Sequence, residues 1–417
     1  MKNKLKKSIF KFIKTTIFHI KTNHKKIKIA WFPKIDSKET LIRELSRCIW
    51  YLSPVKDKIE HIVFFLDEKI ELDNVLENFI VPDYVDPSIS GMWLDLKGLV
   101  EFQHFNKLPN ISTFDLVIEW QKTLSTKQFF PNIIRADILN NQFEANHIIQ
   151  VSTLLEKTNL KKMIKDNHNR FRKFVSDLKA TPYESVLLIG SGPSVQELDT
   201  INNDFSNSLI IVCNSIVKNN HIFNTYKPKI IVASDAVFHS GYSSYAFEFR
   251  KMVIQRMLED QDLIFIVPLR DFVIYRAYFP DILKERIIGI PIQRKNKYNF
   301  NISNQFYLKS TSNILTLMMM PLGLMLHSNI FLIGFDGRTQ KDIDVFWSYD
   351  ENSQFQTTYD ATKIAHPAFY KVSYAHYYEK HCNEIDSLVK QARKSNIISI
   401  KHLTYSHIPA LGQLNNG

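Results

Sequence analysis

The chain has 417 residues, of which 45% are apolar and 23% charged, a composition that excludes an intrinsically disordered or fibrous protein. This length is enough for two domains with separate cores. The formal net charge of +11 favours a polyanionic surface, a phosphorylated substrate or an anionic membrane. Nucleic acid is not an expected partner, because the sequence has no zinc-finger spacing and no aromatic strand of the RNA-binding type.

The cysteines are too few and too far apart to form a disulfide framework or a zinc site. They are Cys48, Cys213 and Cys382. A reducing compartment is the expected location. Lysines interrupt every apolar run near the amino terminus, so we expect no signal peptide and place the protein in the cytoplasm.

Residues 1–28 form the first predicted segment, a basic amphipathic helix. The segment has many lysines and no acidic residue. Its apolar positions at helical spacing are Leu5, Ile9, Phe12, Ile13, Ile17 and Ile20. Such a helix can lie on the anionic inner membrane surface or dock on the protein's own core, and the sequence leaves both open.

Residues 29–150 predict an amino-terminal α/β domain. Apolar runs at 28–32, 61–66, 116–120 and 133–136 indicate strands, and residues 39–52 have the pattern of an amphipathic helix. Alternating strands and helices are typical of a mostly parallel sheet. Residues 81–105 show no assignable pattern. Residues 151–182 predict a connecting helix that leads into the second domain.

The second domain, residues 183–417, begins with an unbroken apolar run and a glycine-rich turn, VLLIGSGPS over residues 186–194. This pattern predicts a buried strand, a tight turn and a helix whose free amides face the turn. Gly190 and Gly192 allow close backbone approach, Pro193 suits the first helical turn, and Ser194 adds a hydroxyl. The sequence therefore predicts an anion-binding corner, although a simple turn explains the glycines too.

Further apolar strands in this half also end in small polar residues. Asn214 follows strand 209–212, Asp235 follows strand 230–233, and Gly334–Asp336 follow strand 330–333. Ligands of open parallel sheets bind outside the carboxyl ends of the strands, so we expect these side chains to converge on one crevice. The fold class expected for this half is a Rossmann-like parallel α/β sheet.

Lys309 and three hydroxyl residues, 310–312, precede an apolar run at 314–326. We expect the hydroxyls to cap a buried helix and to form a second anion site. Met318, Met319 and Met320 are interpreted as core filling.

Residues 337–378 are polar and aromatic, a composition typical of a lid or binding loop. A helix at 379–394 and a strand at 397–403 follow. His366 and His376 are the candidate general bases, whereas His381 and His402 are interpreted as surface or packing residues. The histidines lack the HExxH spacing of a zinc site.

The chain resembles bacterial sialyltransferases of the Campylobacter lipooligosaccharide type in a set of motifs and in their order. The motifs are residues 186–199, Cys213–Asn214, Thr311–Ser312, Gly334–Asp336 and a histidine ahead of the last helix. The same motifs are similar to the domain of motility accessory factors and of 6-hydroxymethylpterin diphosphokinases. The resemblance covers residues 183–410.

The resemblance implies a sugar donor activated by cytidine monophosphate (CMP), a bacterial surface glycan as acceptor, inversion at the anomeric carbon, and no metal or other cofactor. It also implies that His376 is the base and that Tyr349 and Tyr359 stabilise the departing phosphate. The substrate-binding residues that it implies are Gly190, Ser191, Gly192, Pro193, Ser194, Asn214, Asp235, Lys309, Thr311, Ser312, Gly334, Asp336 and Arg338.

Some of these positions depart from the family pattern. Ser191 and Asp235 replace asparagines, Lys309 replaces an arginine and Arg338 replaces a tyrosine. A lysine lacks the bidentate grip of arginine on a carboxylate, so the donor sugar stays open. Asp235 also suits Mg²⁺, which leaves open a Mg²⁺-dependent diphosphokinase. A non-catalytic nucleotide-binding protein of a glycan-synthesis cluster is the third alternative.

Overall fold

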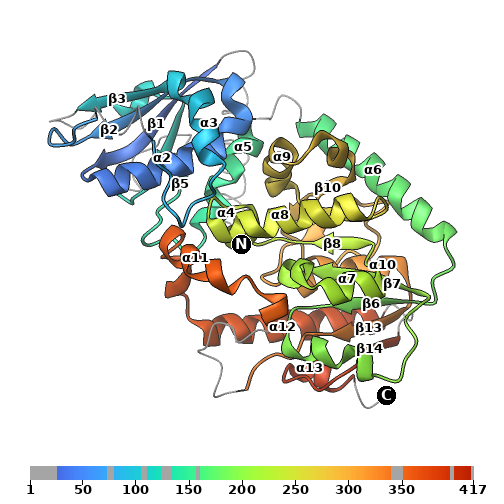
Figure 1. Cartoon of the computed structure of the whole chain (residues 1–417). Coiled ribbons are helices and arrows are strands. Elements are labelled where there is room, and N and C mark those ends of the chain that lie inside the picture. The colour runs from blue at the N-terminus through green and yellow to red at the C-terminus, as the bar shows by residue number, and fades with distance from the viewer. Residues whose placement is uncertain are drawn as a thin grey trace, which may run out of the picture. The chain divides into compact units, whose positions relative to one another are not determined.

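The computed structural model of the protein describes residues 26–72, 79–104, 110–123, 133–155, 160–339, 351–394 and 399–414 (Figure 1). The chain divides into two compact units. Unit 1 comprises Met1–Lys161, Ala236–Phe247 and Thr358–Lys371, and unit 2 comprises Lys162–Asp235, Glu248–Thr357 and Val372–Gly417. The basic helix predicted over residues 1–28 lies outside the described residues, except for residues 26–28. The prediction is wrong for Ile27 and Lys28, which belong to the first strand of unit 1.

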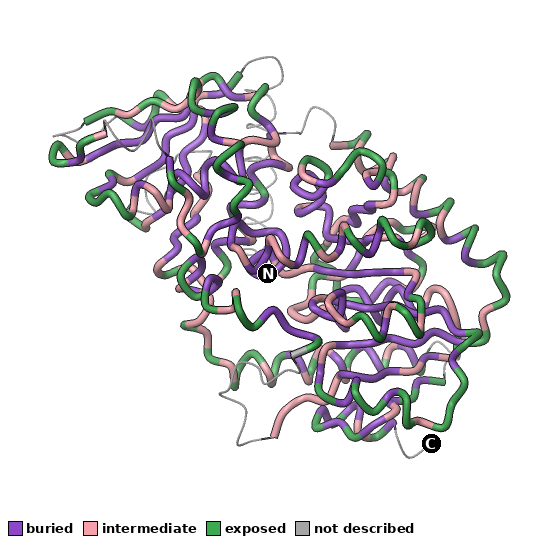
Figure 2. The backbone as a smooth tube through the Cα atoms, in the orientation of Figure 1, coloured by how far each residue is buried: buried purple, intermediate pink, exposed green. Residues whose placement is uncertain are grey.

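Unit 1 is built on a five-stranded sheet of order β3-β2-β1-β4-β5, and every neighbouring pair is parallel. The four strands predicted in residues 29–150 are confirmed as members of this one sheet. The strands are β1 (Ile27–Ile35), β2 (Ile59–Leu66), β3 (Val100–His104), β4 (Leu116–Glu119) and β5 (Ile133–Arg135). The central strands are buried on both faces, which explains why they read as nearly continuous apolar runs (Figure 2).

The helices of unit 1 start with α2 (Lys38–Leu52), which confirms the helix predicted at 39–52. Ser37 caps it by accepting a hydrogen bond from the amide of Thr40 at 3.2 Å. The stretch 81–105, unassigned from sequence, contains α3 (Ile89–Leu96) and β3. Other helical elements of this unit include α4 (Glu144–Ile148), α5 (Gln150–Leu155), a π-helical turn at Ala236–Ser240 and α11 (Tyr359–Ala365).

Unit 2 is built on a seven-stranded parallel sheet of order β10-β9-β8-β7-β6-β13-β14. Its strands are β6 (Ser185–Ile189), β7 (Ser208–Cys213), β8 (Ile230–Val232), β9 (Ile264–Pro268), β10 (Ile287–Ile290), β13 (Asn329–Ile333) and β14 (Ser399–His402). The chain runs outward from β6 to β10 and then returns to β13 on the other side of β6. The strand order therefore reverses between β6 and β13, the position where ligands of such sheets bind.

The helices of unit 2 complete the predicted α/β architecture. They are α6 (Leu160–Ala180), α7 (Asn220–Tyr226), α8 (Ser244–Glu259), α9 (Leu269–Tyr278), α10 (Met320–Leu326), α12 (Tyr374–Lys394) and α13 (Pro409–Gly412). The first residues of α6 and α8 belong to unit 1. A short parallel pair, β11 (Ile292–Gln293) and β12 (Leu308–Lys309), precedes α10. The segment after the glycine turn is a 3₁₀-helix, Pro193–Thr200.

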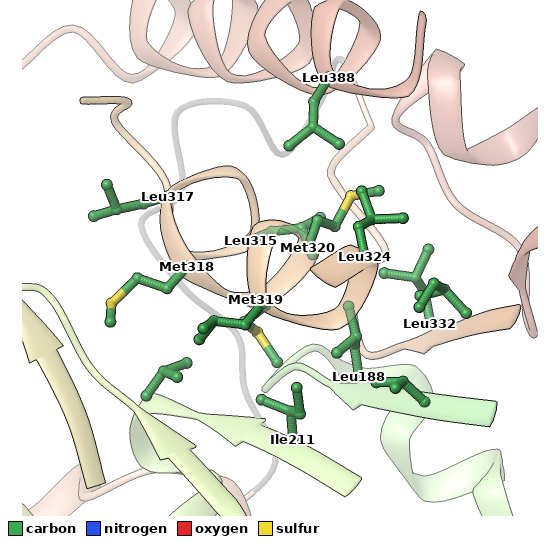
Figure 3. Close-up of a cluster of buried hydrophobic side chains, with 14 of the residues drawn as sticks. Leu188, Ile211, Leu315, Leu317, Met318, Met319, Met320, Leu324, Leu332 and Leu388 are labelled. Carbon is green, nitrogen blue, oxygen red and sulfur yellow. The ribbon is translucent and has the colours of Figure 1, made fainter. Parts of the chain in front are cut away.

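One hydrophobic cluster of unit 2 contains residues of the sheet and of α12. A π-helical turn at Leu315–Met319 continues into α10, and both contribute residues to this cluster. Figure 3 shows its methionines between Leu188 and Ile211 of the sheet and Leu388 of α12. Met318, Met319 and Met320 are each 0% exposed, which confirms their interpretation as core filling.

Candidate functional site

The glycine-rich turn after β6 packs against the turn that follows β13. The amide of Gly190 donates to the carbonyl of Ile333 at 2.8 Å, and the amide of Gly192 donates to the carbonyl of Gly334 at 2.9 Å. A Cβ atom on Gly190 would lie 2.4 Å from the Gly334 oxygen, and one on Gly192 would lie 2.3 Å from Oδ2 of Asp336. Both glycines are therefore needed for the contact between these turns.

The anion-binding corner predicted at Ser194 holds a carboxylate from the protein itself. The amide of Ser194 donates to Oδ2 of Asp336 at 3.1 Å, and its Oγ accepts from the amide of Gly334 at 3.1 Å. Among the described residues, Oδ1 of Asp336 is buried and has no hydrogen-bond partner. Asp336 thus supplies the negative charge that the sequence led us to expect from a ligand.

Asn214, directly after β7, has a rare backbone conformation. Its φ of 53° lies in the left-handed region, which non-glycine residues adopt uncommonly. Its side-chain oxygen Oδ1 is buried and has no hydrogen-bond partner among the described residues. A buried amide oxygen normally has a donor, so this atom points to a water molecule or a ligand group.

The second predicted corner, at Ser312, also holds a carboxylate of the protein. The amide and Oγ of Ser312 both donate to Oε2 of Glu384, at 2.9 and 2.7 Å. The expectation that the hydroxyls cap the following helix is wrong, because Oδ1 of Asn313 accepts from the amide of Leu315 at 2.7 Å instead. Thr311 accepts a hydrogen bond from Thr316 at 3.1 Å.

His376 and Lys309, both predicted site residues, line one hollow of about 340 Å³ in unit 2. The predicted helix at 379–394 begins earlier, at Tyr374, so His376 lies within its first turn and is exposed. The residues that line the hollow are Tyr298, Lys309, His376, Glu379, Lys380, Asn383, Glu384 and Ser387. Glu384 also holds Ser312, so the hollow adjoins the second corner.

Two residues that line this hollow, Lys309 and Tyr298, both interact with Glu384. Nζ of Lys309 lies 4.0 Å from the ring centroid of Tyr298, a cation–π distance. Burial lowers the pKa of Lys309, and the carboxylate of Glu384 opposes that shift. The hydroxyl of Tyr298 donates to the backbone oxygen of Glu384 at 2.9 Å.

Asp235 lies within electrostatic range of the Ser312 corner. The hydroxyl of Tyr377 donates to the backbone oxygen of Ser312. Tyr377 is 36% exposed, but desolvation of its hydroxyl, together with the charges of Asp235 and Glu384, raises its pKa. Burial also raises the pKa of Asp271 to about 6, with Arg270 opposing the shift and Asp235 adding to it. Asp235 is thus one of several carboxylates at this end of the sheet.

Some predicted residues do not join this group. Tyr359 and His366 belong to unit 1, and Tyr349 lies outside the described residues. The amide of Arg338 donates to the hydroxyl of Tyr378 at 3.1 Å. His381 and His402 are buried in unit 2, as expected of packing residues.

His366 is part of a buried ionic cluster in unit 1. Its Nδ1 atom contacts Oε1 of Glu144, and Oε2 of Glu144 lies 2.6 Å from Nη2 of Arg47. Nη1 of Arg47 lies 2.8 Å from Oε2 of Glu44. All four side chains are at most 2% exposed. The cluster ties α11 to α2 and α4, and its burial gives His366 no access to a substrate.

The sequence reasoning missed three residues at the hollow and its corner: Glu384, Tyr298 and Tyr377. A helical pattern could have found Glu384, because it follows His376 by eight residues and therefore lies on the same helix face. No local pattern points to Tyr298, which reaches the site from a different part of the chain.

Comparisons of the sequence and structure with known protein families, curated proteins and solved structures found no match. Among the described residues, no helix is long and apolar enough to cross a membrane. The same part of the chain contains no group of three or more metal-ligating side chains arranged around one point.

Proposed function

We propose that the protein is a glycosyltransferase that moves a sugar from a CMP-activated donor to a bacterial surface glycan, with inversion and without a metal ion. The supporting observation is that His376 and Lys309, far apart in the sequence, line one hollow beside the Ser312 corner. His376 belongs to the motifs that resemble the sialyltransferase family, and Lys309 stands where that family has an arginine.

In the proposed reaction, the acceptor hydroxyl attacks the anomeric carbon while the bond from that carbon to the CMP phosphate oxygen breaks. The acceptor proton goes to His376, whose ring is exposed at the hollow. CMP departs as an anion and needs fixed positive or hydrogen-bonding groups. Lys309 offers an ammonium group, and Ser312 offers an amide and a hydroxyl for this purpose.

The test is release of CMP from a donor, measured with purified protein and an acceptor glycan. His376→Ala should lower turnover by about 10² to 10⁴-fold, the usual contribution of a general base, and should leave cytidine nucleotide binding unchanged. His221→Ala is the matched control, because this exposed histidine pairs with Asp199 and does not line the hollow. Normal transfer by His376→Ala would show that the base is elsewhere.

A chelator separates the enzyme alternatives. Transfer that survives a chelator supports the metal-independent reaction, whereas complete loss of activity would favour Mg²⁺-dependent diphosphate transfer. Saturable cytidine binding without donor cleavage under any acceptor would favour a non-catalytic nucleotide-binding protein.

We also propose that residues 1–28 hold the protein at the anionic inner leaflet. The chain without residues 1–25, which leaves strand β1 intact, should lose binding to vesicles that contain anionic lipid. Unchanged binding would reject this role.

A further inference from the structure

The corner at Ser312 is closed by a carboxylate of the same chain. Two donors of Ser312, the amide and Oγ, converge on one oxygen of Glu384, Oε2. Hydrogen bonds to a charged acceptor are stronger than neutral ones, so this contact is more specific than ordinary packing. The side chain of Glu384 is 18% exposed, and it borders the hollow.

Glu384 has a second partner on its own helix. Its other oxygen, Oε1, lies 3.9 Å from Nζ of Lys380, one turn earlier on α12. The side chain of Lys380 is 56% exposed and also lines the hollow. Lys380 therefore offers the carboxylate a second partner one helical turn away from the first.

We propose that Glu384 is a built-in competitor of anionic ligands at the Ser312 corner. The carboxylate occupies the donor pair that an anionic group of the donor sugar needs, and it turns toward Lys380 when that group binds. The observed affinity is then the intrinsic affinity reduced by the fraction of molecules in which the corner is open. The identity of the natural anion rests on the proposed function, but the competition itself is independent of it.

The test follows the amide signal of Ser312 by NMR in protein labelled with ¹⁵N-serine. Loss of this signal in Ser312→Ala assigns it. Acetate and methyl phosphate are titrated separately at constant ionic strength, so that a carboxylate and a phosphate are distinguished. Glu384→Ala should bind one of these anions about 10- to 100-fold more tightly than the wild type, the factor that a hydrogen bond to a charged group is worth.

Glu379→Ala is the matched control. Glu379 lines the same hollow and lies on the same helix as Glu384, but Ser312 donates to Glu384. Removal of Glu379 therefore measures the effect of losing one negative charge alone. Glu384→Gln keeps the shape of the side chain and should fall between the wild type and Glu384→Ala. The proposal is overturned if Glu384→Ala binds no more tightly than Glu379→Ala, or if neither anion moves the Ser312 signal in any variant.

The outcome is distinguishable from failure of the proposed function. Competition for simple anions in a protein that binds no cytidine nucleotide would leave the role of Glu384 intact and reject the donor. If the protein binds a cytidine nucleotide but Glu384→Ala and Glu379→Ala bind the anions equally well, the role of Glu384 is rejected and the proposed donor is retained.

Discussion

His381 should make unit 2 sensitive to mild acid. This side chain is 9% exposed on α12, and among the described residues its Nδ1 atom has no hydrogen-bond partner. Burial lowers its pKa from 6.5 to about 4, because the charged ring cannot be solvated there. The folded state therefore favours the neutral ring, and the unfolded state binds the proton more readily.

The sign and size of the effect follow from this difference. Above the ordinary pKa of 6.5 the ring is neutral in both states, and it costs the folded state no stability. As the pH falls from 6.5 toward 4, the unfolded state binds the proton first and the free energy of unfolding decreases progressively. At pH 5 the loss is about 2 kcal/mol, and below pH 4 it reaches about 3 kcal/mol. His381→Phe replaces the ring with one that cannot be protonated and should remove this part of the acid sensitivity.

Urea-dependent hydrogen exchange of α12 peptides, read by mass spectrometry, reports the free energy of unfolding of the region that contains His381. The quantity to compare is the change between pH 7.5 and pH 5 in the wild type and in His381→Phe. Contributions of all other titrating groups cancel in this comparison. Equal pH dependence in the two proteins would refute the reasoning, and His381→Leu tests whether the result depends on the new ring.

Three further predictions concern stability. Gly192→Ala should destabilise unit 2 by about 1 to 3 kcal/mol in urea unfolding, because the new Cβ would lie 2.8 Å from the Gly334 oxygen, whereas a Cβ on Gly98 meets nothing within 4 Å. Arg47→Met should cost about 3 to 5 kcal/mol in unit 1, because it removes the buried guanidinium that the carboxylates of Glu44 and Glu144 share, whereas Lys34→Met should cost much less, because its ion pair is exposed. Glu144 is fully buried, yet Arg47 and His366 lower its pKa, so its contribution is present above the ordinary value of 4.5 and is lost below it. In urea unfolding, Glu144→Gln should be less stable than the wild type at pH 7 and lose less stability on acidification.

Each of these predictions has a clear contrary outcome. Equal stability of Gly192→Ala and Gly98→Ala would mean that the two turns do not need their close approach. A cost for Arg47→Met no larger than for Lys34→Met would mean that the buried cluster contributes no more than a surface ion pair. Parallel stability curves for Glu144→Gln and the wild type below pH 4.5 would contradict the lowered pKa of Glu144.

Much of the fold was predictable because strands and helices leave local patterns. The apolar runs at β1, β2, β6, β7 and β13 and the helical period of α2 and α12 indicated the elements directly. The partners of the site residues were not predictable in this way. Asp336 reaches Ser194 across 142 positions, and Glu384 reaches Ser312 across 72. No periodic pattern encodes such contacts, so the sequence indicated two anion corners without showing that the chain fills both.

The assignment of His366 illustrates the same limit. In the sequence this histidine stands in a polar, aromatic stretch that is typical of a lid, as His376 does. Its environment depends on Glu144, which is 222 positions away, and on the buried guanidinium of Arg47. Only the tertiary structure separates the exposed histidine from the buried one.

The path of the chain between its two units has a practical consequence. The backbone passes from one unit to the other at residues 161/162, 235/236, 247/248, 357/358 and 371/372. A gene fragment for residues 162–417 would therefore carry Ala236–Phe247 and Thr358–Lys371 without the rest of unit 1, and His366 would lose its buried partner Glu144. Because unit 1 is made of three separate stretches of the chain, a single crossover cannot exchange either unit intact.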